Sequence, residues 1–174
     1  SEREVTTAEI DYVVQRIVQL ASQFTSPRIG CLGLTYKANV DSFEASLEAK
    51  MNEWTAALKP YAGRQILTYH PTWRYFGRRF SLKADTFLEP KPGIPPSPPH
   101  LAKVMQKMQT AGIRVLLVEP YQPRKTAAGV ASRTNATLVE VCQFPGALPG
   151  TSTYVQLIDT VVKRVAQALA ATKA

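Results

Sequence analysis

The sequence has little of what several classes of protein require. Its 174 residues contain two cysteines and two histidines, too few for a disulfide framework and few for histidine-based catalysis. No apolar run approaches the roughly 20 residues that a membrane-spanning helix needs, and the first residues lack the basic-then-apolar order of a signal peptide. We therefore expect no membrane insertion, and the sequence by itself assigns no cellular location to this chain.

Acidic residues are also scarce: 13 against 21 lysines and arginines, which gives a formal net charge of +8. Such a balance can serve nucleic acid or another acidic partner. The cations are scattered, however, and the densest group, Arg74, Arg78, Arg79 and Lys83, has nearly helical spacing, as an ordinary solvated helix face does. We expect no nucleic-acid partner.

Amphipathic helices alternate with short apolar strands along the chain. The expected helices cover residues 6–24, 41–58, 71–80, 98–111, 124–134 and 151–170, where apolar residues recur at three and four positions. The expected strands cover residues 28–34, 65–69, 84–88, 114–119 and 137–142, of which 84–88 is a brief strand or an extended piece. The pattern predicts one three-layer α/β/α domain over residues 1–174, with a mostly parallel sheet of about five strands.

Two helices carry clear apolar stripes, and both cysteines fall in apolar strands. The residues expected to point inward are Phe43, Leu47, Met51, Trp54 and Leu58 in the second helix, and Tyr154, Ile158, Val161, Val165 and Leu169 in the last. Cys31 and Cys142 are expected to be free buried thiols inside strands 28–34 and 137–142.

In a parallel sheet, the functional site lies beyond the carboxyl ends of the strands. His70 follows strand 65–69, where an imidazole can bind a borderline metal or act as an acid or base; the alternative is a histidine satisfied by a neighbouring carbonyl. Glu119 ends strand 114–119 as a possible metal ligand, although such a carboxylate can equally cap a loop or pair with an arginine. His100 falls in the first turn of a surface helix. We find no catalytic residue, and the glycines before Lys37 match neither the dinucleotide fingerprint nor the phosphate loop.

Several motifs follow one another in a characteristic order from residue 36 to the C-terminus. They are Tyr36-Lys37-Ala38-Asn39, Leu58-Lys59-Pro60, the run Thr68-Tyr69-His70-Pro71-Thr72-Trp73-Arg74-Tyr75-Phe76, Pro96-Ser97-Pro98-Pro99-His100-Leu101, Val118-Glu119-Pro120, and the helix from Thr153 to Leu169. This region resembles the C-terminal lobe of periplasmic metal-binding proteins of zinc and manganese ABC importers. The resemblance implies a two-lobed protein that holds zinc or manganese in its cleft, with two histidines from the N-terminal lobe. His70 matches the histidine of the C-terminal lobe, whereas no carboxylate between Glu140 and Asp159 matches the family's aspartate.

The first 41 residues carry a different resemblance. The segment Tyr12-Val13-Val14-Gln15-Arg16, followed by Arg28 to Asp41, is similar to the start of the C-terminal domain of nucleotide-sugar dehydrogenases of the UDP-N-acetylmannosamine and UDP-glucose type. That family's catalytic cysteine motif and nucleotide-binding domain are missing, so we expect no enzyme activity. The chain is interpreted as a chimera of a dehydrogenase-like segment (1–41) and a metal-binding-protein-like lobe (42–174), joined near residues 36–41.

Three functional hypotheses follow. One is an engineered or recombined α/β scaffold that folds without independent activity and requires no cofactor. The alternative is weak zinc or manganese binding through His70, as part of an importer's binding protein whose parent family is periplasmic. A third, sugar-nucleotide binding through Lys37 and Asn39, needs partners that this chain lacks. An exposed cleft or sheet edge would also favour a homodimer.

Overall fold

The computed structural model describes residues 12, 15, 16, 19, 37–91 and 93–172, with the side chains of 37–42 left out. The chain divides into two compact units, residues 1–41 and 42–174, and the sheet described below belongs to the second. Four residues of the expected helix 6–24 are described, and all four are helical. The expected strand 28–34 and Cys31 lie outside the described residues, as do the side chains of Lys37 and Asn39.

Four parallel strands form the sheet in the described part of the chain. They are β1 (Gln65–Thr68), β2 (Lys83–Phe87), β3 (Val115–Val118) and β4 (Thr137–Glu140), in the order β2-β1-β3-β4. The pairing Leu67 with Leu116 and Leu116 with Leu138 sets the register across the middle of the sheet. The expected parallel α/β fold is therefore confirmed, and segment 84–88 is a true strand.

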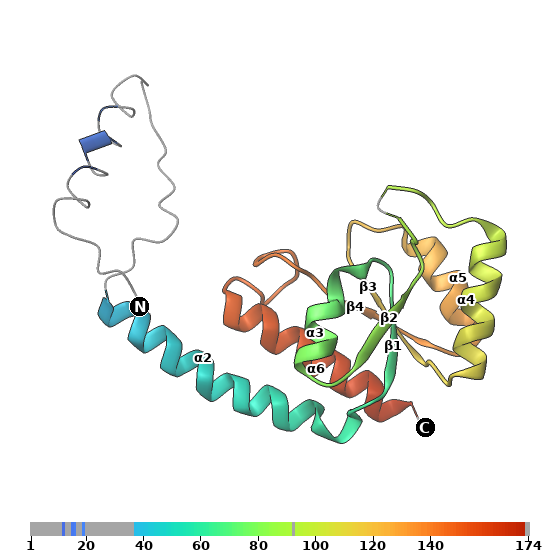
Figure 1. The fold of residues 1–174 in the computed structure, drawn as a ribbon, viewed down its shortest axis with the longest axis horizontal. Coiled ribbons are helices and arrows are strands. Elements are labelled where there is room, and N and C mark those ends of the chain that lie inside the picture. The colour runs from blue at the N-terminus through green and yellow to red at the C-terminus, as the bar shows by residue number, and fades with distance from the viewer. Residues whose placement is uncertain (1–11, 13–14, 17–18, 20–36, 92, 173–174) are drawn as a thin grey trace. The chain divides into compact units, whose positions relative to one another are not determined.

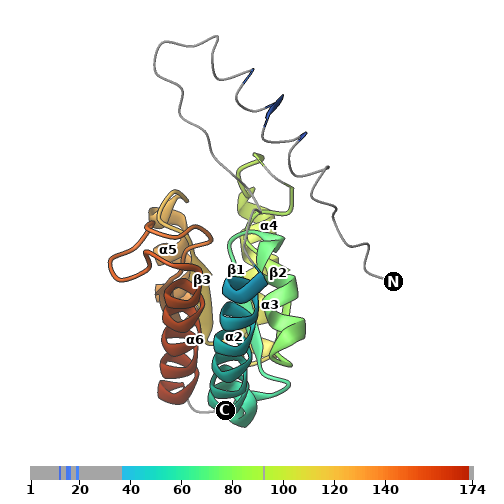
Figure 2. The same cartoon turned by 90° about the vertical axis from the view of Figure 1, so that its left-hand side faces the viewer.

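Helices cover both faces of this sheet (Figures 1 and 2). The helices α2 (Lys37–Leu58), α3 (Arg74–Arg79) and α6 (Tyr154–Ala171) lie on one face, and α4 (Pro98–Thr110) and α5 (Arg124–Thr134) lie on the other. Local signals place the ends of two of them. Ser97 caps α4 by accepting a hydrogen bond from the backbone N–H of His100, and Thr153 forms a reciprocal capping box with Gln156 at the start of α6.

The capping box corrects the expected start of the last helix, because residues 151–153 lie before it rather than in its first turn. The second helix differs in the opposite direction: α2 already begins at Lys37, so part of the expected polar loop before Asp41 is helical. No helix among the described residues is long and apolar enough to cross a bilayer.

Two apolar clusters, one on each face of the sheet, make up the core. The cluster under α2, α3 and α6 contains Trp54, Leu58, Val161, Val165 and Leu169. Two residues expected to point inward are instead exposed, Phe43 by 47% and Tyr154 by 51%. The reason is length: strands of four or five residues span about 13–17 Å, whereas helices of 18 and 22 residues span about 27–33 Å. The ends of these helices therefore extend past the sheet.

A further correction concerns Cys142. Strand β4 ends at Glu140, so this cysteine lies after the strand rather than within it. Its thiol is buried and free, as expected.

A partly buried hydrogen bond joins α2 to α6 on the larger cluster. The indole Nε1 of Trp54 donates to Oδ1 of Asp159 at 3.1 Å, and Lys163 contacts the other carboxylate oxygen at 2.6 Å. Burial alone raises the pKa of Asp159, but the hydrogen bonds from Lys163 and Trp54, with the charges of Lys163 and Lys50, outweigh it and lower the pKa below its ordinary 3.8.

We predict that Asp159→Asn lowers the free energy of unfolding by about 1 kcal/mol at neutral pH, because it weakens this junction of α2 and α6. A carboxyl whose pKa is lower in the folded protein stabilises the fold above its unfolded pKa and loses that effect as the pH falls. The difference between wild type and variant should therefore shrink below about pH 4, measured by urea unfolding at several pH values. Asp85→Asn, on the exposed face of β2, is the control; an equal effect there would contradict the prediction.

Candidate functional site

The carboxyl ends of β1 and β2 bring together a histidine and a glutamate. His70 lies two residues after the end of β1, and Glu89 lies two residues after the end of β2. The strand pairing continues past both strands, because the backbone N–H of Glu89 donates to the carbonyl of Tyr69 at 2.9 Å. This extension places Nε2 of His70 at 2.9 Å from Oε2 of Glu89. The imidazole therefore pairs with a carboxylate rather than with a carbonyl.

The surroundings hold this pair in place while leaving it open to solvent. The side chains of His70 and Glu89 are 22% and 10% exposed, and the hydroxyl of Thr68 donates to the His70 carbonyl at 2.6 Å. The phenol of Tyr69 lies close by in the core: burial is the main cause of its raised pKa, and the negative charge of Glu89 adds to it. An imidazole with a carboxylate beside it is an arrangement that can hold a cation.

Glu119, the other predicted ligand, has a different environment. It is 1% exposed, and its Oε1 accepts hydrogen bonds from the indole of Trp73 at 2.8 Å and from the amide of Gln143 at 2.7 Å. Its Oε2 and both side-chain polar atoms of Gln122 are buried without a hydrogen-bond partner among the described residues. Its carboxylate thus joins the end of β3 to the loops that follow β1 and β4.

The structure does not bring the predicted ligands into one metal centre. Among the described residues, no three histidine, cysteine or acidic side chains form a group that could hold a metal ion. His100 is in the first turn of α4, as expected, and its Nε2 lies 3.3 Å from the carbonyl oxygen of Phe87. Sequence reasoning missed Glu89, although the strand-end rule that found His70 reaches it once 84–88 is accepted as a strand.

Comparison with known proteins places this chain in a family. A family model described as "Zinc-uptake complex component A periplasmic" matches residues 33–168. Parallel strands with helices on both faces thus agree with the fold of a metal-binding solute-binding protein. The chain belongs to this zinc-uptake family.

The individual relatives share a low sequence identity with this chain. The high-affinity zinc uptake system protein ZnuA of Brucella abortus is 26% identical over 101 residues, which are 58% of this chain and 30% of that protein. A solved structure of the solute-binding protein FpvC of Pseudomonas aeruginosa, in complex with Mn²⁺, has a TM-score of 0.65 and 18% identity over 95% of this chain and 58% of that one. That likeness concerns the fold. The chain therefore spans less than two thirds of the length of the relatives it matches.

A second match is shorter. The NDP-N-acetyl-D-galactosaminuronic acid dehydrogenase of Ralstonia nicotianae is 46% identical over 44 residues, which are 25% of this chain and 10% of that enzyme. A dehydrogenase-like segment is therefore present, but it is small beside the region shared with the zinc-uptake family, whose members are solute-binding proteins rather than enzymes.

The position of Glu119 leads to a stability prediction. In Glu119→Ala, the Trp73 and Gln143 donors lose a buried acceptor, so the free energy of unfolding should fall by about 2–4 kcal/mol. Glu140→Ala is the matched control at the end of β4, where the carboxylate pairs with the largely exposed Arg124 and its removal should cost less than about 1 kcal/mol. Urea unfolding measures both. Equal losses would show that the buried hydrogen bonds of Glu119 have no special weight.

Proposed function

We propose that this chain binds zinc or manganese through His70, as one lobe of the solute-binding protein of an ABC importer. The observation that carries the proposal is the His70–Glu89 pair at the carboxyl edge of the sheet, in a chain that belongs to a zinc-uptake family. Imidazole nitrogen and carboxylate oxygen are both donors that zinc accepts, and carboxylate oxygen also suits manganese.

The pair defines how the histidine would meet a metal. Nε2 of His70 is engaged by the Glu89 carboxylate, so in the neutral ring the lone pair of Nδ1 is left for the ion. A carboxylate that holds the far nitrogen of a ligating histidine fixes the ring and makes it a better donor. In this arrangement Glu89 orients the ligand; if the ring turned, the same carboxylate would be a second donor.

The affinity of the isolated lobe should be low. Zinc sites use four donors, or three and a water, and the described residues provide no such group. A lobe with one histidine and one neighbouring carboxylate should therefore bind weakly and discriminate poorly between zinc and manganese. The hypothesis of a recombined scaffold without metal affinity makes the opposite prediction and is tested by the same measurement.

The two histidines of the chain provide the experiment. Chelator-treated protein is titrated with zinc, and the heat of binding and the melting temperature are followed. We expect binding at a concentration on the order of tens of micromolar, its loss in His70→Ala, and about tenfold weaker binding in Glu89→Gln.

His100→Ala is the matched control, since it removes the other histidine, whose ring nitrogen lies beside the Phe87 carbonyl and away from Glu89. It should bind zinc as the wild type does. Equal loss in both histidine variants would indicate adventitious binding, and no response of the wild-type protein would favour the scaffold.

A further inference from the structure

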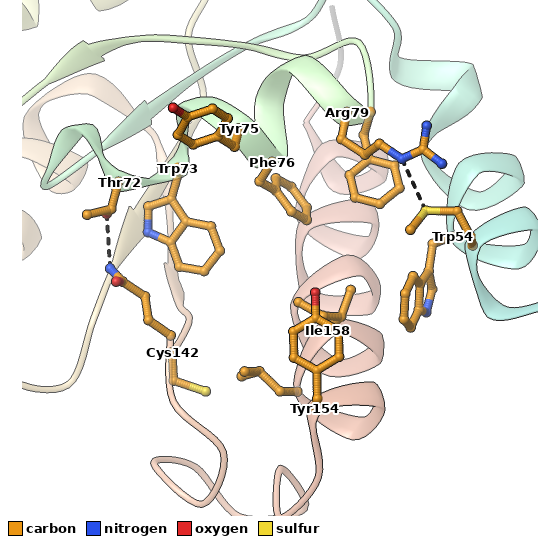
Figure 3. Close-up of a pocket in the computed structure, with 13 residues that line it drawn as sticks. Trp54, Thr72, Trp73, Tyr75, Phe76, Arg79, Cys142, Tyr154 and Ile158 are labelled. Atoms are coloured by element: carbon orange, nitrogen blue, oxygen red, sulfur yellow. Dashed lines mark hydrogen bonds between the residues drawn. The ribbon is translucent and has the colours of Figure 1, made fainter. Parts of the chain in front are cut away.

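A hollow lies between α2, α3 and α6, and its lining does not include His70 or Glu89 (Figure 3). Its volume is about 340 Å³, within the range of small-molecule sites. Six of the side chains around it are aromatic: Trp54, Trp73, Tyr75, Phe76, Phe80 and Tyr154. We call this hollow the aromatic pocket.

The walls of the aromatic pocket are held rigidly. Trp73 and Phe76 meet edge to face with ring centroids 5.8 Å apart, and Phe76 packs on Phe80 at 4.9 Å. The indole N–H of Trp73 is fixed by Glu119 and that of Trp54 by Asp159. The pocket is therefore largely pre-formed, which lowers the entropic cost of binding a ligand.

Two of the aromatic side chains that line the pocket are exposed to solvent. Tyr75 is 82% exposed and Tyr154 is 51% exposed, and both are drawn in Figure 3. Exposed tyrosines at a concave apolar surface provide contact area at low conformational cost. A planar ligand could contact these tyrosine rings first and then the buried indoles of the pocket.

The lining of the aromatic pocket has one cation, which on its other side borders a hollow that Glu44 and Glu48 also line. Arg79 is the only charged residue among those that line the aromatic pocket, and no carboxylate pairs with its guanidinium in the described part of the chain. Its Nε donates to the sulfur of Met51 at 3.3 Å, and a thioether is a weak acceptor. The guanidinium retains donors for a carboxylate, the group whose geometry it matches best.

We propose that the aromatic pocket binds a small aromatic carboxylate, with the ring among Trp73, Phe76 and Tyr154 and the carboxylate at Arg79. The ring gains apolar and edge-to-face contacts, and the anion meets the one cation of the lining. This site is independent of the proposed metal binding, because none of the lining residues is His70 or Glu89.

Both tryptophans of the chain line this pocket, so their emission reports directly on its occupancy. The probe is phenylpropionate, compared with phenylpropanol and phenylpropylamine, which keep the ring but are neutral and cationic. We expect a saturable change in tryptophan emission with phenylpropionate, with a dissociation constant on the order of a millimolar. Phenylpropanol should bind about fivefold more weakly and phenylpropylamine more weakly still.

Two arginines of α3 provide the matched variants. Arg79→Gln should weaken phenylpropionate about fivefold and leave phenylpropanol unchanged, because it removes only the charge at the rim. Arg78→Gln removes a neighbouring charge that does not line the pocket and should change neither. Ile158→Phe fills part of the pocket and should abolish binding of both compounds, with circular dichroism showing that the variant is folded.

Several results would overturn the proposal. One is the absence of any saturable change with phenylpropionate in the folded wild-type protein. Another is binding of the amine as tight as that of the carboxylate, and a third is an equal effect of Arg78→Gln and Arg79→Gln. Emission that changes with protein concentration alone, together with dimers in sedimentation, would show a second copy of the chain on this surface instead.

Discussion

A single buried carboxylate holds the carboxyl edge of the sheet together. Oε1 of Glu119 accepts hydrogen bonds from Trp73 and Gln143, residues that follow β1 and β4 on either side of β3. A buried acceptor with several donors is costly to remove, because each donor is then left without a partner. The loop that begins with His70 and the aromatic wall that begins with Trp73 both depend on this contact for their position.

The central strand contributes to the clusters on both faces of the sheet. All four residues of β3 are buried, and they alternate between the two clusters, with Leu117 on one side and Leu116 on the other. The α4 and α5 face closes with small side chains such as Ala127 and Ala131. The opposite face is built from large rings, whose edge-to-face packing leaves space that neighbouring aliphatic side chains do not fill.

Much of this architecture could be predicted from local sequence patterns. The strand segments, the Ser97-Pro98 start of α4 and the inward stripe of α6 are short-range features, and local sequence signals find them. The burial of two residues was predicted wrongly, because an apolar stripe continues along a helix beyond the sheet that would cover it. Phe43 and Tyr154 lie on the correct faces of α2 and α6, but these helices are longer than the sheet they cover, and sequence periodicity contains no information on that mismatch.

Local sequence patterns could not predict which side chains from neighbouring strands contact each strand-end residue. These contacts determine the chemistry of His70 and Glu119. The strand-end rule selected both His70 and Glu119 as candidates. Trp73 and Glu119 are 46 residues apart and Gln143 and Glu119 are 24 apart, so no local signal indicates that this carboxylate meets two donors. The outcome separates the two residues physically: Glu119 is 1% exposed with two N–H donors on one oxygen, whereas the His70 side chain is 22% exposed with one carboxylate beside it. An ion arriving from solvent must reach a donor atom without breaking buried hydrogen bonds, and that requirement favours His70 as the metal-binding residue of this edge.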